Sequence, residues 1–201
     1  MIVPGTNPWY NNSNNGGPVG TQSITDGTSN SAMFSEHLIG INDPGDGQGN
    51  KVIRSDPKSV RAMFLINITL NHDNDPNGAS ALSFAQQCST IPGSTVSLGT
   101  RNVGAHWNLG VAYAIPNNGY THVNAPNTPR CTYSNGEDST SPTPSWCGSM
   151  CSAAPTSNHS GGVNIGFADG SVKFIKNSIA LPTFWALGTR NQNEVIDASA
   201  L

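Results

Sequence analysis

The sequence predicts an α+β fold, and three segments carry that prediction. Every second residue from Val60 to Leu70 is apolar, which is typical of a β-strand with one buried face. Two shorter alternating runs flank Asp169-Gly170 within residues 163–175, which indicates a β-hairpin. Residues 80–88 suit a short helix with Leu82, Ala85 and Cys88 on one side. We therefore expect an antiparallel sheet with short helices and long loops.

The composition favours one folded, loop-rich domain over residues 1–201. Of 201 residues, 35% are hydrophobic and only 10% are charged, whereas a typical domain has about 25% charged residues. The net charge is −3 and no Lys/Arg cluster occurs, so we expect no nucleic acid or anionic membrane as a partner. No apolar run approaches the roughly 20 residues that a membrane helix needs.

Residues 1–23 are expected to form an irregular N-terminal segment, because turn-forming residues dominate them. The first residues lack the basic start and apolar stretch of a signal peptide. The Asn/Ser/Gly/Thr-rich composition and the four cysteines are nevertheless typical of exported proteins. We expect a secreted, periplasmic or cell-surface location, with a leader removed or with the chain beginning inside a longer gene product.

The predicted elements follow in chain order. Val60–Leu70 fits a half-buried antiparallel strand, and the turn at residues 75–78 would cap the helix over residues 80–88. Residues 107–115 are apolar enough for a further strand. Residues 124–160 are rich in Pro, Ser, Thr, Asn and Cys, so we expect a long loop that is either pinned or functional.

The C-terminal part gives the clearest pattern. In the hairpin, both Asp169 and Gly170 can adopt a positive φ. Residues 182–187 are predicted to form one or two helical turns, with Pro182 near the start and Gly188 as the C-terminal cap. Residues 194–196 are predicted to add a last strand.

The four cysteines have two interpretations. Two disulfides would pin the 124–160 loop, and four cysteines allow three pairings between which the sequence does not choose. A disulfide contributes about 2–4 kcal/mol. Alternatively, three of the cysteines and His159 would bind zinc, although only Cys147 and Cys151 have a close spacing. The candidates are Cys88, Cys131, Cys147 and Cys151.

An acidic loop at residues 73–78 is a candidate calcium site. Asp73, Asp75, Asn77 and Gly78 match positions 1, 3, 5 and 6 of a calcium-binding loop. Phe84 stands where an EF-hand has its bidentate acid, so the loop is not an EF-hand. The alternative is a hydrated turn that caps the following helix.

His159 and Asp169 are the candidate catalytic residues. A histidine near a carboxylate can act as a general base, and the chain has many serine hydroxyls. The G-x-S-x-G and H-E-x-x-H motifs are absent. In the alternative interpretation His159 is a hydrogen-bonded structural residue, and Asp169 is required by the backbone of the hairpin turn.

Two other acids and the tryptophans have mainly structural interpretations. Asp26 lies in a turn-type segment, and Glu36 is expected to be a hydrogen-bonding or surface residue. Tryptophans can stack on sugars, but packing in the core is their commoner role. They are Trp9, Trp107, Trp146 and Trp185.

Several segments resemble one family of secreted bacterial proteins. Residues 159–175 read H-S-G-G-V-N-I-G-F-A-D-G-S-V-K-F-I, which looks like the H-x9-DG signature of that family. Its usual members begin with a prepilin-type leader and helix. The resemblance spans most of residues 20–201, and the further matching segments are residues 24–30, 34–36, 120–127, 185–190 and 194–195.

The resemblance implies a fold similar to the major pseudopilins of type II secretion. In that fold an N-terminal helix packs on an antiparallel sheet, and the loops beside the sheet hold calcium. The prepilin cleavage motif and the long apolar helix are missing from this sequence. Partners would be other pseudopilin-like subunits or cell-surface components.

Three functions follow as expectations. The first is a secreted structural or surface-interaction protein stabilised by calcium. The second is a metal-dependent hydrolase of small esters or lactones, in which a bound cation polarises the carbonyl and His159 acts as the base. The third is a carbohydrate-binding module that uses exposed tryptophans.

Overall fold

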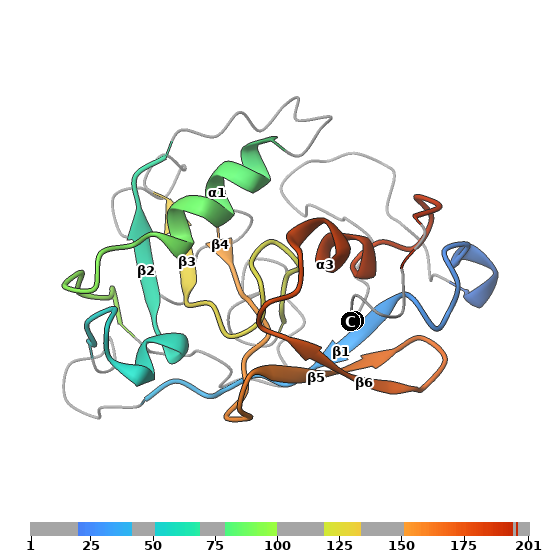
Figure 1. The fold of residues 1–201 in the computed structure, drawn as a ribbon, viewed down its shortest axis with the longest axis horizontal. Helices are drawn as coiled ribbons and strands as arrows, with labels where there is room; N and C mark the ends of the chain where they lie inside the picture. The colour runs from blue at the N-terminus through green and yellow to red at the C-terminus, as the bar shows by residue number, and fades with distance from the viewer. Residues whose placement is uncertain are drawn as a thin grey trace, which may run out of the picture.

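The computed structural model describes residues 20–41, 51–68, 79–99, 119–133, 151–194 and 196, and these residues form two small sheets. Each sheet has three strands and one helix beside it (Figure 1). The predicted α+β class is confirmed. Within the described residues, no helix is long and apolar enough to cross a membrane.

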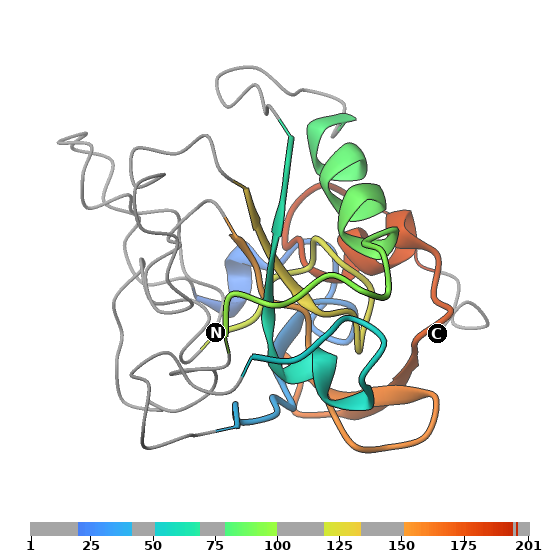
Figure 2. The same cartoon turned by 90° about the vertical axis from the view of Figure 1, so that its left-hand side faces the viewer.

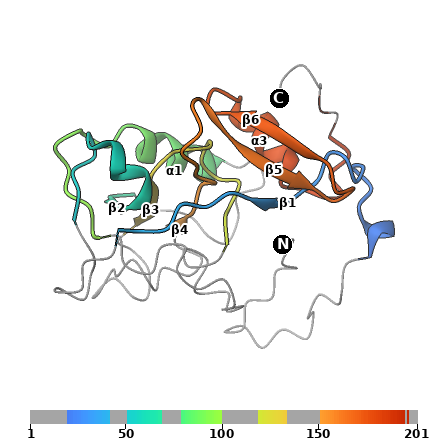
Figure 3. The ribbon, with the colours of Figure 1, turned by 90° about the horizontal axis from the view of Figure 1, so that it is seen from below.

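The first sheet has the order β1-β5-β6 and is antiparallel throughout. Its strands are β1 (Ala32–Ser35), β5 (Gly162–Phe167) and β6 (Val172–Lys176). Figure 3 shows the β5–β6 hairpin in front of helix α3 (Leu181–Leu187), which covers one face of the sheet. The core between helix and sheet contains Ala32, Val163, Ile165, Phe167, Ile175, Ile179, Phe184 and Leu187.

The predicted hairpin is confirmed, but its turn differs from the expectation. Phe167 N donates to Ser171 O at 2.8 Å, and Gly170 N donates to Phe167 O at 3.0 Å. These bonds enclose a three-residue loop, which ends in a residue with positive φ. Gly170 has φ +85°, whereas Asp169 is not among the described residues with positive φ. Only one residue of the turn therefore needs the left-handed conformation.

The predicted C-terminal helix is also confirmed. Helix α3 has Pro182 in its first turn, and Gly188 is its C-cap with φ −85°. The predicted strand over residues 194–196 is not formed at Glu194 or Ile196. Ile196 instead packs against the core beneath the sheet, and the Glu194 carboxylate lies 3.0 Å from the Thr189 hydroxyl. Val195 lies outside the described residues.

The second sheet has the order β2-β3-β4. Its strands are β2 (Met63–Ile66), β3 (Arg130–Tyr133) and β4 (Cys151–Ser152), and helix α1 (Ala79–Ser89) lies beside it (Figure 1). Strands β2 and β3 are parallel, whereas β3 and β4 are antiparallel. The core of this part contains Ala62, Phe64, Ile66, Ile68, Phe84, Cys88, Cys131 and Tyr133.

The expected antiparallel strand over Val60–Leu70 is therefore wrong in its extent and in its pairing. A 3-10 helix occupies Pro57–Arg61, because Asp56 accepts a bond from Lys58 N at 2.8 Å and starts a helical turn. The strand that follows pairs in parallel with β3. The alternation holds from Phe64 onward, where Phe64 and Ile66 are buried and Leu65 is 39% exposed, but Met63 is fully buried as well. Residues 69 and 70 lie outside the described residues.

The predicted helix over residues 80–88 is confirmed as α1, with one difference in its buried face. Phe84, Ala85 and Cys88 are buried, but Leu82 is 41% exposed. Phe84, which was not included in the predicted face, takes its place against Tyr133.

The predicted long loop over residues 124–160 is partly wrong, because its described residues include core structure. Strand β3 is the central strand of the second sheet and is buried at every position. Residues 151–156 are buried as well. Polar and cysteine-rich residues gave no apolar pattern here, and only the neighbouring strands bury them. The predicted strand over residues 107–115 lies outside the described residues, and so do residues 1–19 and 134–150.

The segment at residues 120–124 connects the two parts. His122 stacks on Phe184 of α3 with ring centroids 4.3 Å apart, and Trp185 Nε1 donates to Val123 O at 3.0 Å. Asn124 reaches the second sheet, where it donates to Ser152 Oγ at 2.9 Å. Figure 2 shows residues 119–133 in yellow in the middle of the molecule.

Candidate functional site

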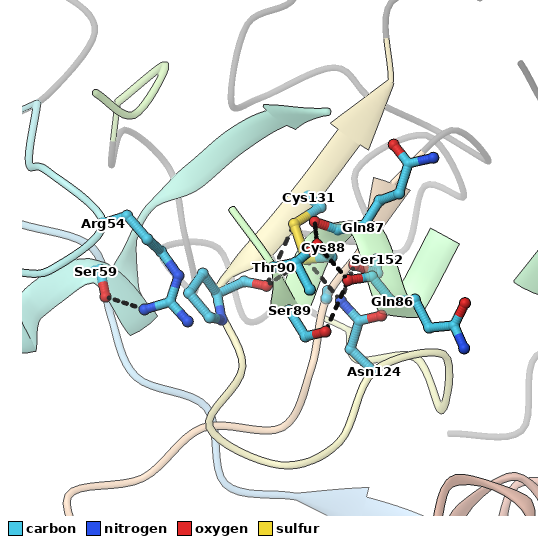
Figure 4. The surroundings of a disulfide bond; sticks show 12 residues. Arg54, Ser59, Gln86, Gln87, Cys88, Ser89, Thr90, Asn124, Cys131 and Ser152 are labelled. Atoms are coloured by element: carbon cyan, nitrogen blue, oxygen red, sulfur yellow. Dashed lines mark hydrogen bonds between the residues drawn. A yellow bond between two sulfur atoms is a disulfide. The ribbon is translucent and has the colours of Figure 1, made fainter. Parts of the chain in front are cut away.

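A disulfide joins Cys88 of α1 to Cys131 of β3 (Figure 4). The amide of Asn124 lies beside it and donates to Cys88 Sγ at 3.0 Å. Cys151 is disulfide-bonded as well, whereas Cys147 lies outside the described residues. A cysteine in a disulfide has no thiolate to offer a metal. The zinc site that would use Cys131, Cys147, Cys151 and His159 is therefore wrong, and the disulfide interpretation is confirmed for Cys88 and Cys131.

The candidate calcium loop lies outside the described residues. This applies to Asp73, Asp75 and Asn77, so calcium binding there stays a prediction. Within the described part of the chain, no group of three or more His, Cys, Asp or Glu side chains is placed to hold a metal.

The Asp26 carboxylate joins two of the segments on which the family resemblance rests. It accepts bonds from the backbone amides of Gln192 (3.1 Å) and Asn193 (2.7 Å) and from the hydroxyl of Thr189 (3.1 Å). The Arg190 carbonyl in turn accepts from Thr25 N at 2.7 Å. All of these bonds hold the chain to itself, so Asp26 has a structural role.

His122 is a buried structural histidine. Its Nδ1 lies 2.7 Å from Phe184 O and its Nε2 lies 3.4 Å from the Tyr120 hydroxyl. A carbonyl only accepts, so we assign the neutral tautomer with the proton on Nδ1. Burial lowers the pKa of His122 to about 4, although the bond to Phe184 opposes that shift. His122 is therefore neutral at physiological pH.

Glu36, His159 and Asn164 meet on the exposed side of the first sheet. His159 Nε2 lies 2.9 Å from Glu36 Oε1, and Asn164 Nδ2 lies 3.2 Å from the same oxygen. Asn164 N donates to Glu36 Oε2 at 2.9 Å. Glu36 directly follows β1, Asn164 lies within β5, and His159 lies in the loop before β5. Two matching segments, residues 34–36 and 159–175, thus come together here.

The surroundings favour the ionised form of Glu36. Partial burial raises the pKa of its carboxyl, but the bonds from Asn164 and His159 outweigh that effect, so the pKa lies below its ordinary value. The side chains remain accessible, with 54% of His159 and 34% of Glu36 exposed. The cluster is therefore a charged, solvent-facing site.

His159 and Asp169 do not come together. Strand β5 lies between them, so His159 is before its start and Asp169 is in the turn after its end. A six-residue strand is about 20 Å long. Asp169 Oδ1 accepts a bond from Ser171 N at 2.9 Å, and bonds from Ser171 lower the pKa of its carboxyl. Asp169 thus stabilises the turn, as the alternative interpretation expected.

Exposed apolar side chains surround the cluster. Phe34 is 62% exposed, Val172 is 67% exposed and Phe174 is 44% exposed. The sheet register places Phe34, Gly166 and Val172 in one row, and Asn164 and Phe174 in the next. All of them point away from α3, because the alternate residues Ile165 and Ile175 are buried under that helix. We call this surface, with Phe34, Glu36, Asn164, Val172 and Phe174, the open face.

The two phenylalanines of the open face were not among the predicted site residues, whereas the tryptophans were predicted candidates. Trp185 is partly buried and packs against the core, and Trp9, Trp107 and Trp146 lie outside the described residues. The sequence signal that could have indicated this face is the alternation in β6, which places Val172 and Phe174 on the face opposite Ile175. The sequence showed the alternation, but it did not show that no helix among the described residues covers this face.

The hydrogen bonds of the cluster limit its chemistry. His159 Nε2 is already bonded to Glu36. The nearby Ser157 hydroxyl donates to Gly162 O at 2.7 Å and accepts from His159 N at 3.0 Å. Its proton is thus given to the backbone and not to the imidazole. Among the described residues, His159 Nε2 donates to Glu36 Oε1 and lies 3.3 Å from Asn164 Nδ2, and the ring is bonded to no serine hydroxyl.

Comparisons with known proteins give one match. A family model described as "Protein of unknown function (DUF1559)" matches residues 4–181. No curated protein and no solved structure matches the chain.

Proposed function

The chain belongs to this DUF1559 family, and we propose that it is an exported structural protein that binds other pseudopilin-like subunits through the open face. The observation that carries the proposal is the exposure of Phe34, Val172 and Phe174 on one side of a three-stranded sheet. Large apolar side chains gathered on a surface are typical of protein contact sites.

The polar part of the open face suits an interface. Glu36 and His159 lie next to the apolar side chains, and the His159 ring meets the edge of Phe174 with centroids 6.4 Å apart. Interfaces combine an apolar centre with a polar rim that gives orientation. A second copy of this chain would offer the same combination, which supports association between copies.

Calcium binding belongs to the same proposal. Asp73, Asp75 and Asn77 precede α1, and a cation there would stabilise the start of that helix. A rise in Tm with millimolar Ca²⁺, absent in Asp73→Asn/Asp75→Asn, would support this part of the proposal. An equal rise in both proteins would argue against these ligands.

The experiment compares two double variants of the full-length protein in a secreting host. In Phe34→Ser/Phe174→Ser the open face loses its aromatic side chains. In Leu82→Ser/Val96→Ser two equally accessible apolar residues outside that face are removed; they are 41% and 57% exposed. We expect chemical cross-linking between subunits to fall at least tenfold in the first variant and to stay unchanged in the control.

Two results would count against the proposal. The first is a soluble monomer even for the unsubstituted full-length protein. The second is equal cross-linking in both double variants, which would move the contact elsewhere. Circular dichroism of each variant checks that the sheets remain folded.

A hydrolase is the second candidate, favoured by the bond between Glu36 and His159. A carboxylate that orients an imidazole is one part of a general-base system. The test is a panel of esters and lactones with and without chelator. A chelator-sensitive activity that Glu36→Gln and His159→Ala abolish would favour this candidate. Carbohydrate binding through exposed rings would show as polysaccharide retention that Phe34→Ser/Phe174→Ser removes.

A further inference from the structure

The geometry points to a binding site for one divalent transition-metal cation, such as Zn²⁺, formed by Glu36, His159 and Asn164. This inference is independent of the proposed contact function. It uses only side chains of the described residues, and it assigns His159 the role of a metal ligand.

The distances within the cluster fit three donors around one ion. The three pairs of side-chain atoms are 2.9 Å apart for His159 and Glu36, 3.2 Å for Asn164 and Glu36, and 3.3 Å for Asn164 and His159. Nitrogen and oxygen ligands lie about 2.0–2.2 Å from zinc. Two such ligands, separated by the angles of octahedral or tetrahedral coordination, are about 2.9–3.5 Å apart. All three distances fall in that range.

The donor types select the class of cation. A neutral imidazole nitrogen and a carboxylate oxygen are common ligands of zinc and its neighbours in the first transition row. Rotating the Asn164 amide by 180° puts Oδ1 where Nδ2 stands, so the third ligand becomes an oxygen. Calcium and magnesium prefer sites made of oxygen alone, and the imidazole disfavours them.

The backbone holds the three ligands in place before any cation binds. Asn164 N donates to Glu36 Oε2, which leaves Oε1 directed at the histidine. Ser157 Oγ accepts from His159 N and donates to Gly162 O, which fixes the loop before β5. Partners of this kind orient metal ligands and raise their affinity. Because the side chains of His159 and Glu36 are partly exposed, the remaining coordination positions face water.

If His159 and Glu36 formed only an ion pair, a substitution of Asn164 would have a different effect. With Asn164→Asp, a second carboxylate would lie beside Glu36. In an ion pair without a cation the two carboxylates repel each other, whereas at a metal site the added charge strengthens binding. The change in Zn²⁺ affinity in Asn164→Asp therefore separates the metal site from the simple ion pair.

The test is calorimetric titration of the natural protein with Zn²⁺ at neutral pH. We expect one saturable site that weakens at least tenfold in Glu36→Gln and His159→Gln and tightens at least fivefold in Asn164→Asp. Asp169→Asn is the matched control, because it removes a carboxylate from the other end of the same hairpin. Asp73→Asn/Asp75→Asn separates binding at the acidic loop from binding here.

Three outcomes would overturn the inference. They are the absence of saturable Zn²⁺ binding, affinity unchanged by His159→Gln, or weaker binding in Asn164→Asp. Denaturation curves without metal establish that each variant is folded. For the zinc-bound protein, a downfield or broadened imidazole signal in NMR spectra assigns the ligand directly.

Discussion

The two sheets of the molecule are assembled from the chain in different ways. In the first, β5 and β6 are consecutive and a three-residue turn joins them. In the second, β2 and β3 pair in parallel although more than 60 residues separate them. Closing such a long segment costs conformational entropy that a hairpin avoids. The second sheet is also the one that has the Cys88–Cys131 disulfide in its core.

This difference suggests that the two sheets depend on different interactions. In the first, the β5–β6 hairpin rests on local turn geometry and on the packing of α3, although β1 also joins it from a distant part of the chain. The second has a covalent bond between α1 and β3. Four substitutions or conditions test this comparison.

The largest effect is expected from removal of the disulfide in Cys88→Ala/Cys131→Ala. The bond closes a segment of 43 residues, for which loop entropy gives about 4 kcal/mol. We expect amides of β2 and α1 to lose hydrogen-exchange protection first, while those of β5 and β6 keep theirs. Uniform loss in both sheets would show that the two parts unfold as one unit.

The second-largest loss of stability is expected when acid protonates His122, which lies between the two parts. Burial lowers its pKa to about 4, whereas the unfolded chain has an ordinary value near 6.5. The folded state therefore binds fewer protons, and its stability is complete above about pH 6.5 and falls toward pH 4. The expected loss is about 3 kcal/mol by urea unfolding.

His37 adds to the same acid sensitivity, because burial, together with the charge of Arg130, lowers its pKa to about 2. The variant His122→Gln isolates the share of His122, since glutamine does not titrate. If the pH profile of His122→Gln matched that of the natural protein, His122 would not be the source of the effect.

A smaller effect is expected from Gly188→Ala. A Cβ there would lie 2.7 Å from the His122 ring, although the backbone conformation itself allows alanine. Moving a packed ring costs about 2 kcal/mol. Gly166→Ala is the control, because its Cβ would meet Phe34 at an ordinary 3.6 Å. Thermal unfolding should separate the two variants, and equal Tm values would contradict the predicted clash.

The smallest loss in the free energy of unfolding is expected from substitutions in the hairpin turn. Gly170→Ala places a side chain on a residue with φ +85° and meets no atom within 4 Å. The cost is therefore conformational, about 1 kcal/mol. Gly170→Asn should cost less, because asparagine tolerates this region better. Guanidinium unfolding curves measure both, and a larger cost for asparagine would contradict the explanation.

Prediction from the sequence succeeded where the pattern was local. The hairpin, α1 and α3 depend on alternation, helical spacing, and Pro or Gly at their ends, all within a short window. It failed for β3, because Arg130 and Thr132 show no apolar pattern and are buried only by their neighbours. The parallel partner of β2 could not be predicted either, since no local signal specifies a distant strand.

The candidate site shows the same difference between local patterns, which were predicted, and distant contacts, which were not. The sequence marked His159 and noted Glu36, but it associated the histidine with Asp169, which lies ten positions along the chain. The antiparallel pairing of β1 with β5 brings Glu36 to Asn164 and His159 instead. A contact between strands from opposite ends of the chain depends on register, which local patterns do not encode.

By itself, the sequence determined the α+β class, the C-terminal hairpin and the two helices, which it predicted over residues 80–88 and 182–187. It also determined the scarcity of charge, which leaves few ionisable groups for a site. These properties depend on composition and on neighbours along the chain. The tertiary structure decided the pairing of Cys88 with Cys131, the neutral state of His122 and the joining of Glu36 to His159. Each of these depends on burial or contact between distant segments, so only the packed chain specifies it.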